Sequence, residues 1–208
     1  MSSSQPKIPK TATRSKRDPE IESWLKYEVP DLHLGGAGDF HEERRHHHAI
    51  FGFHYLPVKK QAPIGSVKFT AIRGPHRTIH IRVFYPRKGE RKRQSHDAAA
   101  LIYFHGGGYT IATVDEFEQG HRILAEESSV IVFVVEYKLA PEWRFHVQLD
   151  EYDAVLDWLY SDGGKDRGVN PSRVLGGGDS AGGNMTAAIS LRRKEGKKGK
   201  KEQMRAQI

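Results

Sequence analysis

A serine flanked by glycines is the residue of this chain best placed to do chemistry. It lies at the centre of Gly178–Gly182, which reads Gly-Asp-Ser-Ala-Gly. A short apolar segment precedes this pattern and a segment with helical periodicity follows it. In that context the serine sits on a sharp turn, whose neighbours two positions away must be small. The turn would project the hydroxyl of Ser180 as a nucleophile and aim the amide of Ala181 at a developing oxyanion.

A second glycine-rich segment, His105–Gly108, comes directly after the apolar run Ala98–Phe104. Glycine lets a backbone approach a substrate closely, so the amides of such a loop can donate hydrogen bonds to an oxyanion. Two motifs of this kind, each at the end of an expected strand, predict an esterase-type site that works by acyl transfer.

Other interpretations of the glycines fail on spacing. The chain has no G-x-x-x-x-G-K-S/T pattern, which excludes a P-loop for nucleoside triphosphates. A dinucleotide fingerprint would need a glycine at Ala181 and an acidic residue about 20 positions later, where Lys200 stands. A plain glycine-rich turn remains the alternative for either motif taken alone.

The elements that position these loops alternate between apolar strands and amphipathic helices. Continuous apolar runs indicate strands buried on both faces, and the alternation predicts a mostly parallel, doubly wound α/β sheet. Ligands bind at the carboxyl ends of such strands, where both glycine-rich loops lie. We expect strands at Ser66–Ile72, Thr78–Phe84, Ala98–Phe104, Val130–Val135 and Val174–Leu175, and helices at Asp115–Glu127, Leu149–Leu159 and Ala181–Leu191.

Three motifs together resemble the hormone-sensitive-lipase-like family of α/β hydrolases. They are Tyr103–Tyr109, Glu136–Glu142 and Gly178–Asn184, and the resemblance runs from about Gly65 to the end of the chain. It implies an α/β-hydrolase fold and a serine carboxylesterase or lipase that acts on a small-molecule ester without a cofactor. It also implies that Ser180 is the nucleophile, that the amides of Gly106, Gly107 and Ala181 form the oxyanion hole, and that His105, Gly108, Gly178, Asp179 and Gly182 support the two motifs.

The expected organisation has three parts. Residues 1–20 should be a disordered lead, residues 21–60 a cap-like segment, and residues 61–208 the hydrolase core. Triad partners in this fold follow the serine in the order acid then histidine, yet Ala181–Ile208 contains neither an aspartate nor a histidine. We therefore expect a core that is truncated at its C-terminal end, and an isolated chain without the triad acid and base. The alternative is a non-catalytic, ligand-binding or regulatory relative, which ligands would stabilise without turnover.

Composition limits the partners. Lys+Arg 33 against Asp+Glu 26 gives a net charge of +7, and the stretch Arg192–Arg205 carries most of the excess. One basic stretch is usually solvated, so we expect no nucleic-acid partner, although salt-dependent retention of RNA or DNA would argue otherwise. No apolar run approaches the roughly 20 residues of a membrane helix, no secretory signal is apparent, and cysteine is absent. These features favour a cytoplasmic protein without disulfides.

Six of the twelve histidines lie between His33 and His54. No carboxylate or cysteine pattern accompanies them in the sequence, so we expect a polar cap surface and no metal site. Measured zinc content would distinguish the two interpretations.

Overall fold

The computed structural model describes residues 17–30, 32, 39–195 and 203–208. The chain divides into two compact units, Met1–Ala37 and Gly38–Ile208. In the first unit, helix α1 (Pro19–Tyr27) begins where the Asp18 carboxylate accepts a hydrogen bond from the Glu20 amide at 2.9 Å. The predicted lead therefore has helical residues at positions 19 and 20, and its residues 1–16 lie outside the described part.

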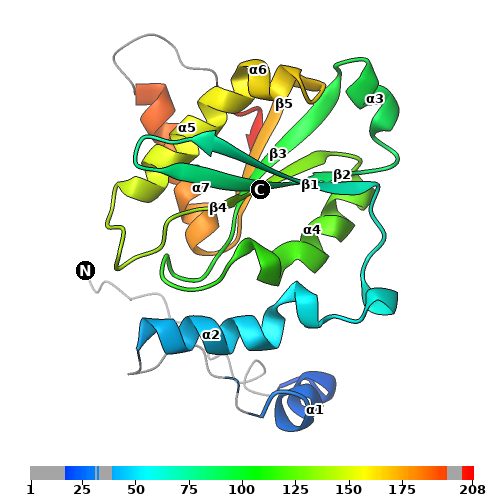
Figure 1. The fold of residues 1–208 in the computed structure, drawn as a ribbon, viewed down its shortest axis with the longest axis vertical. Helices are drawn as coiled ribbons and strands as arrows, with labels where there is room; N and C mark the ends of the chain where they lie inside the picture. Colours follow the sequence, from blue (N-terminus) through cyan, green and yellow to red (C-terminus); the bar gives the residue numbers. More distant parts are fainter. Residues whose placement is uncertain (1–16, 31, 33–38, 196–202) are drawn as a thin grey trace, which may run out of the picture. The chain divides into compact units, whose positions relative to one another are not determined.

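The second unit is built on one mixed six-stranded sheet with the order β1-β2-β4-β3-β5-β6 (Figure 1). The β1–β2 and β2–β4 pairs are antiparallel, and the β4–β3, β3–β5 and β5–β6 pairs are parallel. The predicted α/β-hydrolase sheet is confirmed, with an antiparallel portion at the β1 edge. The strands are β1 (Ser66–Arg73), β2 (Thr78–Tyr85), β3 (Ala98–Phe104), β4 (Ile131–Glu136), β5 (Val169–Gly178) and β6 (Ala206–Gln207).

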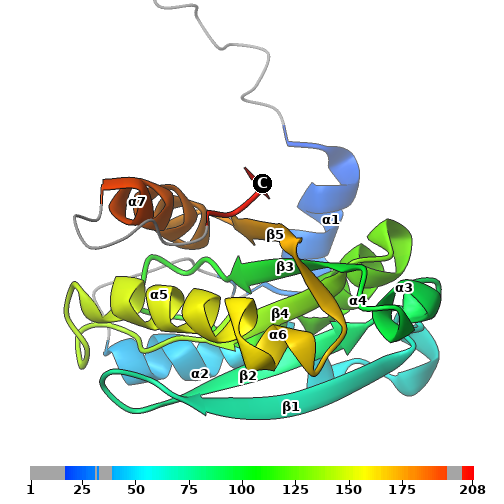
Figure 2. The same ribbon diagram turned by 90° about the horizontal axis from the view of Figure 1, so that it is seen from above.

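Alternating side chains of the central strands build a core on each face of the sheet. In β4, Ile131 and Phe133 belong to one buried cluster, while Val132 and Val134 belong to the other. Helices α5 (Val147–Tyr160) and α7 (Ala181–Glu195) cover the first face and lie side by side (Figure 2). Helix α4 (Val114–Ser128) covers the second face. Strands buried on both faces explain the continuous apolar runs of the sequence.

The sequence ahead of the sheet is more helical than its composition indicates. Helix α2 (Phe40–Phe51) begins after Asp39, whose carboxylate accepts from the His41 amide at 3.2 Å, and Gly52 ends it. Short 3-10 turns η2 (Phe53–Tyr55) and η3 (Val58–Lys60) follow and lead into β1.

Two further helices are short. The basic segment after β2 contains helix α3 (Glu90–Gln94), in which Glu90 accepts from the Nε of Arg93 at 2.7 Å. Helix α6 (Asp162–Lys165) precedes β5, which begins five residues before the predicted Val174. Among the described residues, no helix is long and apolar enough to cross a membrane.

Candidate active site

The register of two parallel strands brings the glycine-rich loops together. Phe104, the last residue of β3, pairs with Gly178, the last residue of β5. The segments that begin at His105 and at Asp179 therefore leave the sheet side by side, at the carboxyl ends of neighbouring strands. This is the position at which open α/β sheets bind ligands.

Ser180 occupies a strained turn between β5 and α7. Its φ is +48°, in the left-handed region that a residue with a Cβ adopts at a cost of about 1–2 kcal/mol, and its side chain is exposed. The flanking glycines are required because a side chain at either position would clash with neighbouring backbone. A Cβ on Gly182 would lie 1.7 Å from the carbonyl oxygen of Phe104, and one on Gly178 would lie 2.5 Å from the same oxygen. Strand β3 thus packs against the turn too closely for any larger residue.

Asp179, the residue before the serine, joins the two loops. Its Oδ1 accepts hydrogen bonds from the Gly106 amide at 2.8 Å and from the Tyr103 hydroxyl at 3.1 Å. An amide has a single hydrogen, and in this structure that of Gly106 is directed at the Asp179 carboxylate. Asp179 therefore holds the two loops together, a role that the sequence motif alone does not indicate.

The remainder of the loop folds back sharply. Gly107, Gly108 and Tyr109 all have positive φ values, of +106°, +58° and +66°. A Cβ on Gly107 would lie 2.3 Å from the carbonyl oxygen of Ile111, so this position also requires glycine. The Gly107 amide donates no hydrogen bond to any described residue.

His105 is an internal support of the loop. Its ring is fully buried, stacks against Tyr137 with 4.4 Å between centroids, and donates from Nδ1 to the carbonyl oxygen of Gly106 at 2.7 Å. Burial lowers the pKa of the imidazole, so the ring is neutral at neutral pH. Tyr137 in turn donates to the carbonyl oxygen of His105 at 3.0 Å.

Arg44 of α2 holds the outer part of the same loop. Its guanidinium donates to the carbonyl oxygens of Thr110 at 2.7 Å and Ala140 at 2.8 Å, and it forms a bidentate pair with Glu142. The hydrogen bonds from Arg44 lower the pKa of the Glu142 carboxyl to about 2. Nothing in the local sequence around Arg44 indicates this role, because its partners lie 66 to 98 residues away.

A family model described as "alpha/beta hydrolase fold" matches residues 101–208, which is more than half of the chain and includes both glycine-rich loops. The chain belongs to the hormone-sensitive-lipase-like family of α/β hydrolases. Its relatives include an arylacetamide deacetylase from Oryctolagus cuniculus, with 34% identity over 62% of this chain and 32% of that protein. Esterase LipI of Mycobacterium tuberculosis is 31% identical over 67% of this chain and 42% of its own length.

Solved structures of the family agree with the fold. A hyperthermophilic esterase from the archaeon Pyrobaculum calidifontis superposes with a TM-score of 0.72 and 29% identity, covering 86% of this chain and 54% of that chain. The thermostable carboxylesterase EstE1 from a metagenomic library gives a TM-score of 0.66 and 31% identity, covering 77% of this chain and 52% of that one. The chain spans about a third of the length of the curated relatives it matches.

The contacts around Ser180 can be compared with the serine–histidine arrangement typical of α/β hydrolases. Ser180 is exposed at its turn, but no described histidine is hydrogen-bonded to it. The buried His105 and His121 are both held within the protein interior. Within the described residues, the Ser180 hydroxyl is therefore exposed beside the glycine loop, and no histidine is hydrogen-bonded to it.

The start of the basic stretch is neutralised by α5. Arg192 pairs with Asp150 at 2.7 Å, and the buried Arg193 pairs with Asp157 at 2.9 Å and with Asp153. These pairs occupy two of the cations that a nucleic-acid surface would need. Residues 196–202 of the stretch lie outside the described residues.

Proposed function

We propose that this protein is a serine carboxylic ester hydrolase in which Ser180 is acylated by the substrate. The observation that carries the proposal is the exposed serine at positive φ, at the end of β5 and beside the glycine loop that ends β3. Attack by the Ser180 oxygen on an ester carbonyl forms a tetrahedral oxyanion. Collapse of that intermediate releases the alcohol and leaves an acyl-serine, which water then hydrolyses.

The oxyanion donors in this proposal are the amides of Gly107 and Ala181. Gly107 has an unengaged amide, and Ala181 provides the first amide of α7, where the helix dipole also favours negative charge. Asp179 holds Gly106 and so fixes the loop that presents Gly107. The relatives named as esterases and carboxylesterases support an ester as the substrate class.

The acid and base expected after the serine in this fold are not found among the residues from Ala181 to Ile208. No aspartate or histidine follows Ser180 in the printed sequence, and both follow the serine in this fold. Without them the 208-residue chain should turn over p-nitrophenyl butyrate at a rate near background. Donors and binding alone can still give roughly 10³–10⁴-fold over water, which is enough to label the serine slowly.

The test is acylation measured by peptide mass spectrometry after incubation with p-nitrophenyl butyrate. We expect butyryl-Ser180 to accumulate roughly 10³-fold faster than the adduct on Ser172, an exposed serine of the same chain. Ser180→Ala should abolish the labelling without lowering the melting temperature. Equal labelling of Ser180 and Ser172 would refute the nucleophile assignment. Rapid, sustained hydrolysis that depends on Ser180 would refute the absence of a base.

The alternative function is a ligand-binding relative without turnover. It is favoured by the lack of a described histidine bonded to Ser180. Saturable thermal stabilisation by esters, together with unlabelled Ser180, would support that function over acyl transfer.

A further inference from the structure

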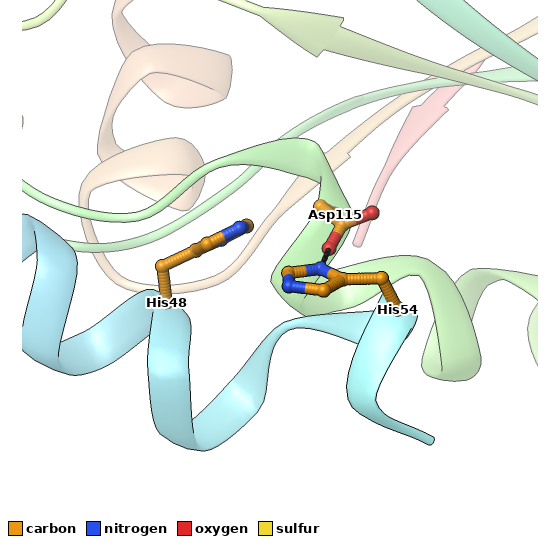
Figure 3. A group of neighbouring side chains, drawn as sticks. All are labelled: His48, His54 and Asp115. Carbon is orange, nitrogen blue, oxygen red and sulfur yellow. Dashed lines mark hydrogen bonds and ion pairs between the residues drawn. The ribbon is translucent and has the colours of Figure 1, made fainter. Parts of the chain in front are cut away.

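Three side chains from separate elements converge beside the start of α4. They are His48 of α2, His54 of η2 and Asp115 in the first turn of α4 (Figure 3). One ligating atom from each lies within 4.8 Å of the other two. The ring of His48 points toward the pair formed by His54 and Asp115, whose Nδ1 and Oδ2 are 2.9 Å apart (Figure 3).

Two of the three groups already contact each other, and the third has a nitrogen without a hydrogen-bond partner. Arg82 approaches Asp115 through the other carboxylate oxygen, Oδ1, at 3.4 Å, whereas Oδ2 is the oxygen paired with His54. The Nδ1 of His48 is buried without a hydrogen-bond partner. The carboxylate of Glu116 adds negative charge, with its Oε1 3.6 Å from that nitrogen, and it also hydrogen-bonds His47.

We propose that His48, His54 and Asp115 bind a divalent transition-metal ion of the Zn²⁺ class. Two imidazoles and one carboxylate form a ligand set that suits Zn²⁺, with water completing a tetrahedron. Bond lengths of about 2.0–2.2 Å place tetrahedral ligands about 3.4 Å apart. A separation as wide as 4.8 Å would therefore shorten on binding, and the 2.9 Å contact between His54 and Asp115 would lengthen. Mg²⁺ and Ca²⁺ prefer sets made of oxygen and bind this one poorly.

The ion would join the segment ahead of the sheet to the core. His48 and His54 come from residues 40–55, whereas α4 follows directly on the loop that contains His105 and Gly107. A bound ion therefore anchors α2 and η2 to the helix that ends this loop. The site is distinct from Ser180 chemistry and does not depend on it. Sequence spacing does not indicate this grouping, because Asp115 is 61 residues from His54 in sequence.

The experiment is calorimetric titration of the untagged, metal-free chain with ZnCl₂, alongside thermal unfolding. We expect one tight Zn²⁺ per chain, a rise in melting temperature with Zn²⁺, and no such rise with MgCl₂ at the same concentration. His54→Gln and Asp115→Asn should each weaken Zn²⁺ binding at least roughly 10-fold. His41→Gln, at an exposed histidine of α2, should leave the binding unchanged.

Asp115→Asn is nearly isosteric, so circular dichroism and the metal-free melting temperature will separate lost binding from lost folding. If the folded variants retain the affinity of the parent chain, the proposed ligands are wrong. Absence of Zn²⁺ binding to the parent chain, or equal stabilisation by Mg²⁺, would also overturn the site. None of these readouts involves ester hydrolysis, so the result is independent of the proposed function.

Discussion

The amide of Gly106 donates to Oδ1 of Asp179 across 2.8 Å, which ties the loop after β3 to the turn after β5. The two loops come from neighbouring strands, and this bond fixes their separation beyond the end of the sheet. The contact is so close that a Cβ on Gly106 would lie 2.1 Å from the Asp179 carboxylate. Glycine at position 106 thus serves packing against Asp179, while Gly107 carries the proposed donor.

Removal of this tie should destabilise the protein measurably. Asp179→Ala leaves the partly buried Gly106 amide and Tyr103 hydroxyl without their acceptor, at a cost of about 1–3 kcal/mol in the free energy of unfolding. Urea denaturation measures the change. Asp179→Asn keeps an oxygen that can accept from Gly106, so its cost should be smaller. Equal stability of Asp179→Ala and the parent chain would show that the bond contributes nothing.

Gly182, two positions after Ser180, should tolerate no substitution. In Gly182→Ala the new Cβ meets the Phe104 carbonyl oxygen at 1.7 Å, so strand β3 or helix α7 must move, and we expect a loss of more than about 3 kcal/mol. Gly120→Ala in α4 is the matched control, because nothing lies within 4 Å of its Cβ. Helix propensity predicts that this control gains up to about 1 kcal/mol. A stable, unshifted Gly182→Ala protein would contradict the described turn.

Arg44 should control how firmly the outer loop is held. Arg44→Ala removes the donors to the carbonyl oxygens of Thr110 and Ala140, and we expect a loss of about 1–3 kcal/mol. Hydrogen exchange at the Ala140 amide, which donates to Tyr109 at 2.8 Å, should accelerate by roughly tenfold or more. Arg44→Lys keeps the charge but loses the planar fork, so it should restore only part of the protection. Unchanged exchange in Arg44→Ala would show that the hydrogen bonds of Arg44 do not control the order of this loop.

Acid should destabilise the protein through His121. Burial between Tyr103 and Phe117 lowers its pKa from 6.5 to about 4, and the positive charge of Arg82 acts in the same direction. The unfolded state therefore binds a proton first as the pH falls below 6.5. Above that pH His121 is neutral in both states and does not lower the free energy of unfolding. As the pH falls toward 4, that free energy decreases by up to about 3 kcal/mol.

Urea denaturation of the parent chain and of His121→Leu, at pH 7 and pH 4.5, tests this effect. The variant should lose less stability over the interval, while His80→Gln at an exposed histidine should follow the parent chain. Parallel pH profiles for all three proteins would contradict the assignment.

The central strands and the helices between them were predictable because their signals are local. The run Ala98–Phe104 coincides with β3 as observed, and the helix expected at Asp115–Glu127 differs from α4 by one residue at each end. The position of both glycine loops at strand ends followed from the same pattern. The family resemblance was confirmed by the comparison over residues 101–208.

The contacts that hold the site could not be predicted from the sequence, since each depends on the register of the folded sheet. The engagement of Gly106 by Asp179 follows from the pairing of Phe104 with Gly178, which no spacing rule contains. The hydrogen bond from Arg44 to Thr110 and the grouping of His54 with Asp115 join residues more than 60 positions apart. The cap-like assignment of residues 21–60 stays a prediction.

The partners of Arg44 also bear on the order in which the chain folds. Helix α2 has no buried residue of its own, and an isolated helix of 12 residues is marginal in water. Its anchoring carbonyls belong to Thr110 and Ala140, on connections that take shape only after β3 and β4 have paired. We therefore expect α2 to form late, on a sheet that is already assembled, although it precedes that sheet in the chain.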